Sequence, residues 1–247
     1  MAAIRPLSHP PITEAVVDFR VALPPSFAAH SLAQSADQLR DAFPVTEEMR
    51  RFETLIDVRG GKPATTRPSE GQLVGYRFKS ADGRDVAQFR VDGLTYNRLE
   101  PYTNWDTVRP KALHLWNLFV QVTGAARAER LALRYINRLS VPPEGDLTDF
   151  LEVYPPQFPG SPSFVSGFVT RISTHDPVTN FNANVAQTLE LRVPAGRPSL
   201  LFDIDVYKAG GLGRTDQELG PVLDRLRAMK NDIFFGSITE VTARRYE

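Results

Sequence analysis

The order in which hydrophobic patterns follow one another is the strongest constraint on how this chain can fold. Side chains alternate between the two faces of a strand, whereas apolar residues of a helix recur every three or four positions. In each half, an alternating run is followed by a short helical pattern, three more strand-like runs and a longer helical pattern. The strand-like runs lie near 14–23, 52–59, 73–79 and 85–99, and near 130–141, 164–173, 183–193 and 200–208. The run near 85–99 is long, and Gly93 is a position at which it can break.

Two pairs of similar segments favour an internal duplication. Residues 21–25 (VALPP) resemble 139–143 (LSVPP), and 85–94 (DVAQFRVDGL) resemble 203–212 (DIDVYKAGGL). The members of both pairs are 118 residues apart, and a shared gap-free offset is typical of repeated sequence. A true duplication places Val21 and Leu139 in equivalent positions, and likewise Phe89 and Tyr207. The alternative is a chance likeness between amphipathic strands.

These patterns predict an α+β fold of two pseudo-repeat halves, residues 1–125 and 126–247, within one compact domain. Each half is expected to be a strand–helix–three strands–helix unit. Together the units should form one mostly antiparallel sheet of about eight strands with helices on one face. We expect Asn104 to cap a helix that buries Trp116. Thr215 and Glu218 have the spacing of a capping box at the start of the last helix.

Composition excludes several classes of protein. Lys+Arg and Asp+Glu both number 29, so the formal net charge is zero, which disfavours a general nucleic-acid binder. The 247 residues include no cysteine, which removes disulfides, thiolate metal sites and cysteine nucleophiles. No run reaches the roughly 20 apolar residues of a membrane span, and residues 1–11 lack the apolar core of a signal peptide. We expect a cytoplasmic protein without membrane association.

The sheet face without helices is expected to carry charged side chains of both signs. Alternation places them on the first strand of each half and on the run near 183–193. The residues assigned to this binding surface are Asp18, Arg20, Arg130, Arg134, Arg138 and Arg192. Arginines so spaced can bind a protein or an anionic ligand. The alternative is a solvated face on which arginines pair with acids and stabilise the sheet.

Few residues have the arrangement that catalysis requires. Asp203 and Asp205 lie two apart on a strand and share a face, so they are weak candidates for holding a divalent cation. The alternative for both is cross-strand pairing with Arg or Lys. The glycines of 210–213 follow a strand but lack the spacing of a dinucleotide-binding loop, so we interpret them as a turn. We expect no cofactor and assign no catalytic residue.

Several segments resemble a sporadically distributed bacterial family of uncharacterised proteins of about this length. The segments are EAVVDFRV (14–21), DGLTYNRLEPY (92–102), RYINR (134–138) and IFFGSITE (233–240). The resemblance implies no enzymatic activity and no catalytic residues. Its patchy occurrence implies an accessory role, such as a defence or toxin-linked system. Residues that belong to its motifs are Asn97, Arg98, Tyr102, Asn137, Arg138, Ser237 and Glu240.

The leading hypothesis is a non-catalytic protein that binds another macromolecule, with a protein encoded beside it, or a second copy of itself, as the expected partner. Two alternatives stay open. One is a metal-dependent nucleotide-processing enzyme that uses Asp203 and Asp205. The other is single-stranded nucleic acid bound along Arg130, Arg134 and Arg138, which the zero net charge does not favour.

Overall fold

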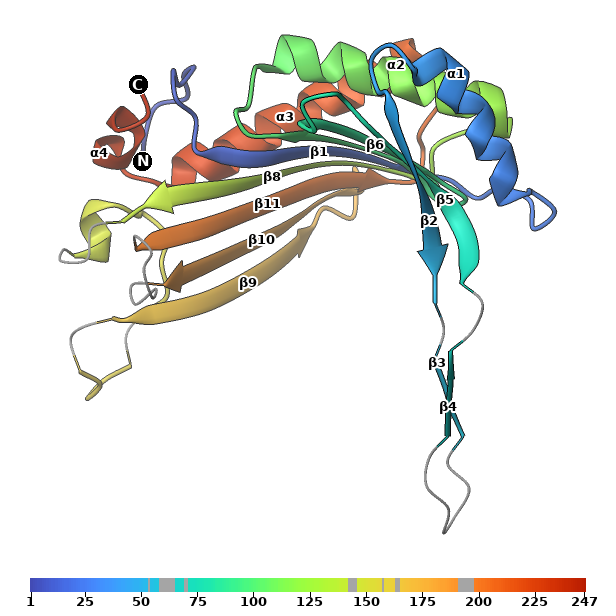
Figure 1. Ribbon diagram of the computed structural model, residues 1–247. Helices are drawn as coiled ribbons and strands as arrows, with labels where there is room; N and C mark the ends of the chain where they lie inside the picture. Colours follow the sequence, from blue (N-terminus) through green and yellow to red (C-terminus); the bar gives the residue numbers. More distant parts are fainter. Residues whose placement is uncertain are drawn as a thin grey trace.

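The computed structural model describes residues 1–52, 54–57, 65–68, 71–141, 146–156, 158–162, 165–190 and 198–247. Nine strands form one antiparallel sheet in the order β2-β5-β6-β7-β1-β8-β11-β10-β9, which confirms the expected α+β class. The bounds are β1 Ile12–Arg20, β2 Val45–Arg51, β5 Gln72–Lys79, β6 Asp85–Arg90, β7 Gly93–Leu99, β8 Arg130–Ser140, β9 Gly167–His175, β10 Phe181–Glu190 and β11 Ser199–Ala209. A separate hairpin, β3 (Thr54–Asp57) and β4 (Thr65–Pro68), projects away from the sheet between β2 and β5 (Figure 1).

Two long helices lie on one face of the sheet, α2 (Trp105–Thr123) and α3 (Asp216–Ser237) (Figure 1). Shorter helical segments are the 3₁₀ turns η1 (Ala29–Gln34) and η2 (Leu147–Asp149), α1 (Ser35–Leu39) and α4 (Glu240–Arg244). In the part of the chain that the structure describes, the opposite face of the sheet carries no helix. The sheet therefore has a covered face and an open face.

Alternation along β8 shows how the sequence selects these two faces. Leu131, Leu133 and Tyr135 are buried against the helices. Arg134 and Arg138, at alternate positions of the same strand, are exposed. Burial of apolar area, at roughly 25 cal/mol per Å², favours this orientation of the strand over its inverse. The same argument orients β11, where every second residue from Leu200 to Val206 is buried.

Trp116 is fully buried, as its place on the helix predicts. Its ring stacks on Phe19 of β1 at a centroid distance of 4.8 Å, and its indole Nε1 donates to the Arg214 carbonyl at 2.8 Å. Asn104 caps α2 by accepting from the Thr107 amide, and Thr215 forms the predicted capping box. The helix boundaries are therefore set by local side-chain chemistry.

The long strand-like run near 85–99 forms the hairpin of β6 and β7. Gly93 marks the break, with a φ of 147° and a position so close to the Phe19 carbonyl oxygen that a Cβ would collide with it. The extra turn raises the number of strands that the first half contributes to the nine-stranded sheet to five, with β2 at the edge of that sheet.

The predicted duplication is not confirmed. Outward from the centre, the halves share an order, β1-β7-β6-β5 and β8-β11-β10-β9. However, β7 lies beside β1 and β11 lies beside β8. The strands in equivalent positions of the two halves are therefore β7 and β11. The 118-residue offset instead aligns β11, with Tyr207, to β6, with Phe89. Similar alternation in amphipathic strands is sufficient to produce that match.

Within the described residues, no helix has the length and apolar character needed to cross a membrane.

Candidate ligand-binding pocket

The predicted charged surface lies on the open face, and its acids and arginines pair with one another. Asp18 on β1 is buried and accepts hydrogen bonds from the guanidinium groups of Arg20 (2.9 Å), Arg90 (3.3 Å) and Arg130 (3.3 Å). The Thr95 hydroxyl donates to the same carboxylate at 2.6 Å. The structure therefore brings Asp18, Arg20 and Arg130 together, and adds Arg90 and Thr95, which the sequence analysis did not assign to this surface.

The two candidate metal ligands also pair with arginines. Arg134 Nε donates to Asp203 Oδ1 at 2.8 Å, and this hydrogen bond raises the pKa of Arg134. Arg130 Nη2 donates to Asp205 at 3.1 Å, and its guanidinium lies 4.2 Å from the ring centroid of Tyr207. Among the described residues, no three His, Cys, Asp or Glu side chains are grouped so that they can hold a metal ion. The cross-strand pairing that was the alternative interpretation is present for both acids.

The remaining predicted residues lie apart from this cluster. Arg138 is exposed, donates to Ser199 Oγ at 3.2 Å, and lines a hollow of about 480 Å³ together with Glu100 and Tyr102. Arg192 lies outside the described residues. The predicted surface is thus mostly an ion-paired sheet, with Arg138 at its end.

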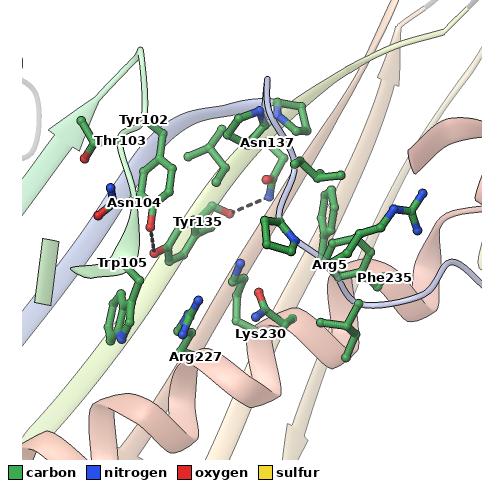
Figure 2. Close-up of a pocket in the computed structure, with 18 residues that line it drawn as sticks. Arg5, Tyr102, Thr103, Asn104, Trp105, Tyr135, Asn137, Arg227, Lys230 and Phe235 are labelled. Carbon is green, nitrogen blue, oxygen red and sulfur yellow. Dashed lines mark hydrogen bonds between the residues drawn. The ribbon is translucent and has the colours of Figure 1, made fainter. Parts of the chain in front are cut away.

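A more enclosed pocket, of about 320 Å³, lies at the covered face (Figure 2). Four segments far apart in the sequence form it: 4–12 before and at the start of β1, 102–105 between β7 and α2, Tyr135 and Asn137 of β8, and one face of α3. The α3 residues in its wall are Arg227, Lys230, Asn231, Phe234 and Phe235. Their spacing of three and four positions places them along one side of the helix.

Lys230 is the unusual member of this pocket. It is only 9% exposed, and its ammonium nitrogen lies 4.2 Å from the ring centroid of Tyr135. No carboxylate of the described chain lies within ion-pair distance of it. Burial, assisted by the positive charge of Arg227, lowers the pKa of Lys230 to about 7. An uncompensated buried lysine is costly, and such groups concentrate at functional sites.

Two tyrosine hydroxyls face the same space. The Tyr102 and Tyr135 oxygens are 3.0 Å apart (Figure 2). Burial raises the pKa of both phenols, so both stay protonated at neutral pH. Asn137, beside them on β8, is buried and donates to the Phe202 carbonyl at 3.0 Å. The pocket wall therefore has two hydroxyl groups, one from β8 and one from the segment before α2, that can donate a proton or a hydrogen bond.

A second cation lines the pocket without a carboxylate partner among the described residues. Arg227 is exposed, and its guanidinium lies 5.8 Å from the ring centroid of Trp105. The third cation, Arg5, differs because it pairs with Glu240 at 2.8 Å and with Glu247. No Asp or Glu belongs to the described pocket wall. Within the described residues, the pocket thus presents two cations without a carboxylate partner, aromatic and aliphatic surface, and no acid.

The segment 1–11 closes one side of the pocket and is tied to the C-terminal part of the chain. The Ala2 amide donates to the Phe235 and Ile238 carbonyls, both at 3.1 Å, and the His9 amide donates to the Tyr246 carbonyl at 2.9 Å. The ion pairs of Arg5 with Glu240 of α4 and with Glu247 add to these bonds. The pocket wall therefore depends on contacts between the two ends of the sequence.

The sequence patterns did not predict this pocket, although a signal was present. Leu219, Leu223 and Leu226 define the buried stripe of α3, and Lys230 continues it at the next helical position. A lysine at a core position is a functional candidate, because it is costly unless something binds it. Segments quoted for the family resemblance also meet here, through Tyr102, Asn137 and the end of α3.

Comparisons with known proteins add no assignment, since no protein-family model matches the chain and no curated protein matches its sequence.

Proposed function

We propose that this protein binds a small organic anion in the pocket between α3 and β8. The observation that carries the proposal is the pair of cations, Lys230 and Arg227, in a wall that contains no carboxylate. A buried cation such as Lys230 requires a counter-charge, and an anionic ligand that also reaches the exposed Arg227 supplies one.

The size and surface of the pocket favour a monocarboxylate with a compact apolar body. Trp105, Phe234 and Phe235 provide apolar wall, and a volume of about 320 Å³ suits a small molecule. Arg227 is permanently charged, whereas Lys230, with a pKa of about 7, is charged in about half of the molecules at neutral pH. This charge matches a single negative group better than a dianionic phosphate.

The test compares benzoate with benzamide, which has the same shape but no charge, by calorimetric titration and thermal shift of the full chain. We expect benzoate to bind and stabilise the protein and benzamide to do neither. Arg227→Gln should weaken benzoate binding at least tenfold. Arg225→Gln is the matched control, because Arg225 is exposed on the same helix outside the pocket wall. Equal binding of amide and acid, or equal effects of the two variants, would contradict the proposal.

Binding of benzoate should also depend on pH. The charged or titratable groups in the pocket wall are Arg5, Tyr102, Tyr135, Arg227 and Lys230. Of these, Lys230 is the group whose pKa, about 7, lies near neutrality. The anion favours the charged amine, so its affinity should fall as the pH rises from 6 to 9. The variant Lys230→Met should lose this dependence.

A protein partner on the open sheet face is a second candidate function, and one observation favours it. Arg138 of β8 and Arg171 of β9 are exposed and make no ion pair within the described chain, and Val169 of β9 is 75% exposed on the same face. Such a surface suits a partner with acidic and apolar groups. The double variant Arg138→Ala, Arg171→Ala should keep its melting temperature and lose a co-purifying partner from native cells. Retention of that partner, or capture of nucleic acid instead, would overturn this candidate.

A further inference from the structure

We propose that the pocket takes a 2-oxo acid and that the Lys230 amine forms a Schiff base with its carbonyl carbon. The inference rests on the anion-binding function proposed above and names its ligand class. Three features of the pocket carry it: a buried lysine without a carboxylate partner, a cation at the pocket mouth, and a pair of protonated hydroxyls.

The lysine has the environment of a nucleophilic amine. Its nitrogen lies above the Tyr135 ring at 4.2 Å from the centroid, faces the pocket, and is shielded from bulk water. Schiff-base lysines are typically activated by desolvation or by a neighbouring cation, and Lys230 has both. A pKa of about 7 leaves a large fraction of the amine uncharged at neutral pH, and only the uncharged form has the lone pair needed for attack.

The reaction also needs a group that binds the carboxylate and a group that donates a proton, and Arg227 and the two tyrosines can supply them. Arg227 can pair with the carboxylate of the ligand, which holds the adjacent carbonyl carbon inside the pocket. The hydrogen-bonded hydroxyls of Tyr102 and Tyr135, 3.0 Å apart, can donate a proton to an oxygen that gains negative charge. A carboxylate in the wall would repel such a ligand, and the described wall has none.

The step balances without a further reactant. The Lys230 nitrogen bonds to the carbonyl carbon, and the carbon–oxygen π electrons move to the oxygen, which takes a proton from the tyrosine pair. The positively charged nitrogen returns a proton to the tyrosine pair, which leaves a neutral carbinolamine. The tyrosine pair then protonates the hydroxyl, which leaves as water while the nitrogen lone pair forms the carbon–nitrogen double bond, and the resulting iminium nitrogen returns its proton to the tyrosine pair. The products are one imine linking Lys230 to the ligand and one water molecule, with no change in oxidation state.

The test traps the imine by reduction. The full-length protein is incubated with pyruvate, treated with sodium borohydride, and examined by intact mass and peptide mapping. We expect one adduct per chain, at Lys230 and not at Lys79, Lys111 or Lys208. Acetone, which has the carbonyl without the carboxylate, should give at least tenfold less adduct. Lactate, which has the carboxylate without the carbonyl, should compete with pyruvate and form none.

Variants separate this chemistry from simple binding. Lys230→Arg keeps the charge and should abolish the adduct, whereas Lys208→Arg should leave it unchanged. Arg227→Gln should slow trapping at least tenfold relative to Arg225→Gln. Trapping by the native chain should also slow below pH 6, where Lys230 is protonated.

The outcomes distinguish the two proposals. If lactate and pyruvate both bind but no adduct forms, the Schiff-base inference fails and anion binding stands. If an adduct spreads over several lysines, the inference also fails. If neither anion binds and no adduct forms, both proposals fall. Because the mapping is done on the native chain, a variant that does not fold leaves the main result intact.

Discussion

Burial of Lys230 lowers the stability of the folded protein, and the same buried amine is the group proposed to bind the ligand. A lysine in an unfolded chain has a pKa of about 10.4, and burial lowers the pKa of Lys230 to about 7 in the folded protein. Between these values the unfolded chain holds one more proton than the folded chain. The contribution of Lys230 therefore makes the free energy of unfolding rise with pH from about 7 to 10. At or below pH 7, burial of the charged amine lowers the free energy of unfolding by its full amount, on the order of a few kcal/mol.

Replacement of this lysine by methionine should stabilise the fold. Lys230→Met keeps the length of the side chain and removes the charge, so it should raise the urea midpoint at pH 6 and have a much smaller effect at pH 9.5. Chemical unfolding at the two pH values measures the difference. Lys208→Met, near the surface, is the control and should show no such trend. A stabilisation of the same size at both pH values would show that desolvation of the ammonium group is not the cause.

The open-face acids should differ in their effect on stability according to burial. Asp18 is buried and accepts hydrogen bonds from three guanidinium groups, so Asp18→Asn should cost about 2–4 kcal/mol. Asp203 pairs with Arg134, whose side chain is 47% exposed, so Asp203→Asn should cost no more than about 1 kcal/mol. Guanidinium-induced unfolding of both variants tests this order. The reverse order would mean that the Asp18 cluster contributes little to the fold.

At the scale of an element, Trp116 is one of the residues that pack α2 against the sheet. Its side chain is fully buried, stacks on Phe19, and donates to the Arg214 carbonyl before α3. Trp116→Ala should therefore cost about 3–5 kcal/mol of unfolding free energy. Asn117→Ala, at the next and more exposed position of α2, serves as the comparison and should cost far less. A loss below about 1 kcal/mol at Trp116 would contradict the packing of α2 described above.

At the scale of the whole molecule, the two halves are parts of one structure. β1 and β8 pair at the centre of the sheet, and the pocket takes residues from both halves. We expect a chain of residues 126–247 alone to show no cooperative thermal transition by circular dichroism, because β8 would lose its neighbour β1. The full chain, treated identically, should unfold in a single transition. Cooperative unfolding of the isolated half would show that the halves are independent domains.

The sequence by itself determined the local structure of this protein. Alternation identified β1, β8 and β11, and helical periodicity identified α2 and α3 with Trp116 on the buried side. Asn104 and Thr215 marked helix starts, because caps form between residues three positions apart. These features depend on neighbours in the chain, and their signals are therefore readable along it.

Only the tertiary structure decided which residues meet. Arg134 was expected to face the open side of the sheet, and it does, but its pairing with Asp203 depends on β11 lying beside β8. Phe89 and Tyr207 are separated by the 118-residue offset, yet their strands do not occupy equivalent positions in the sheet. Strands with the same alternation can occupy different places. Lys230 becomes a buried, uncompensated amine only when α3 packs on β8 and residues 4–12 cross the opening. Burial, and with it the pKa and the chemistry of the site, is a property of the packed elements rather than of any segment.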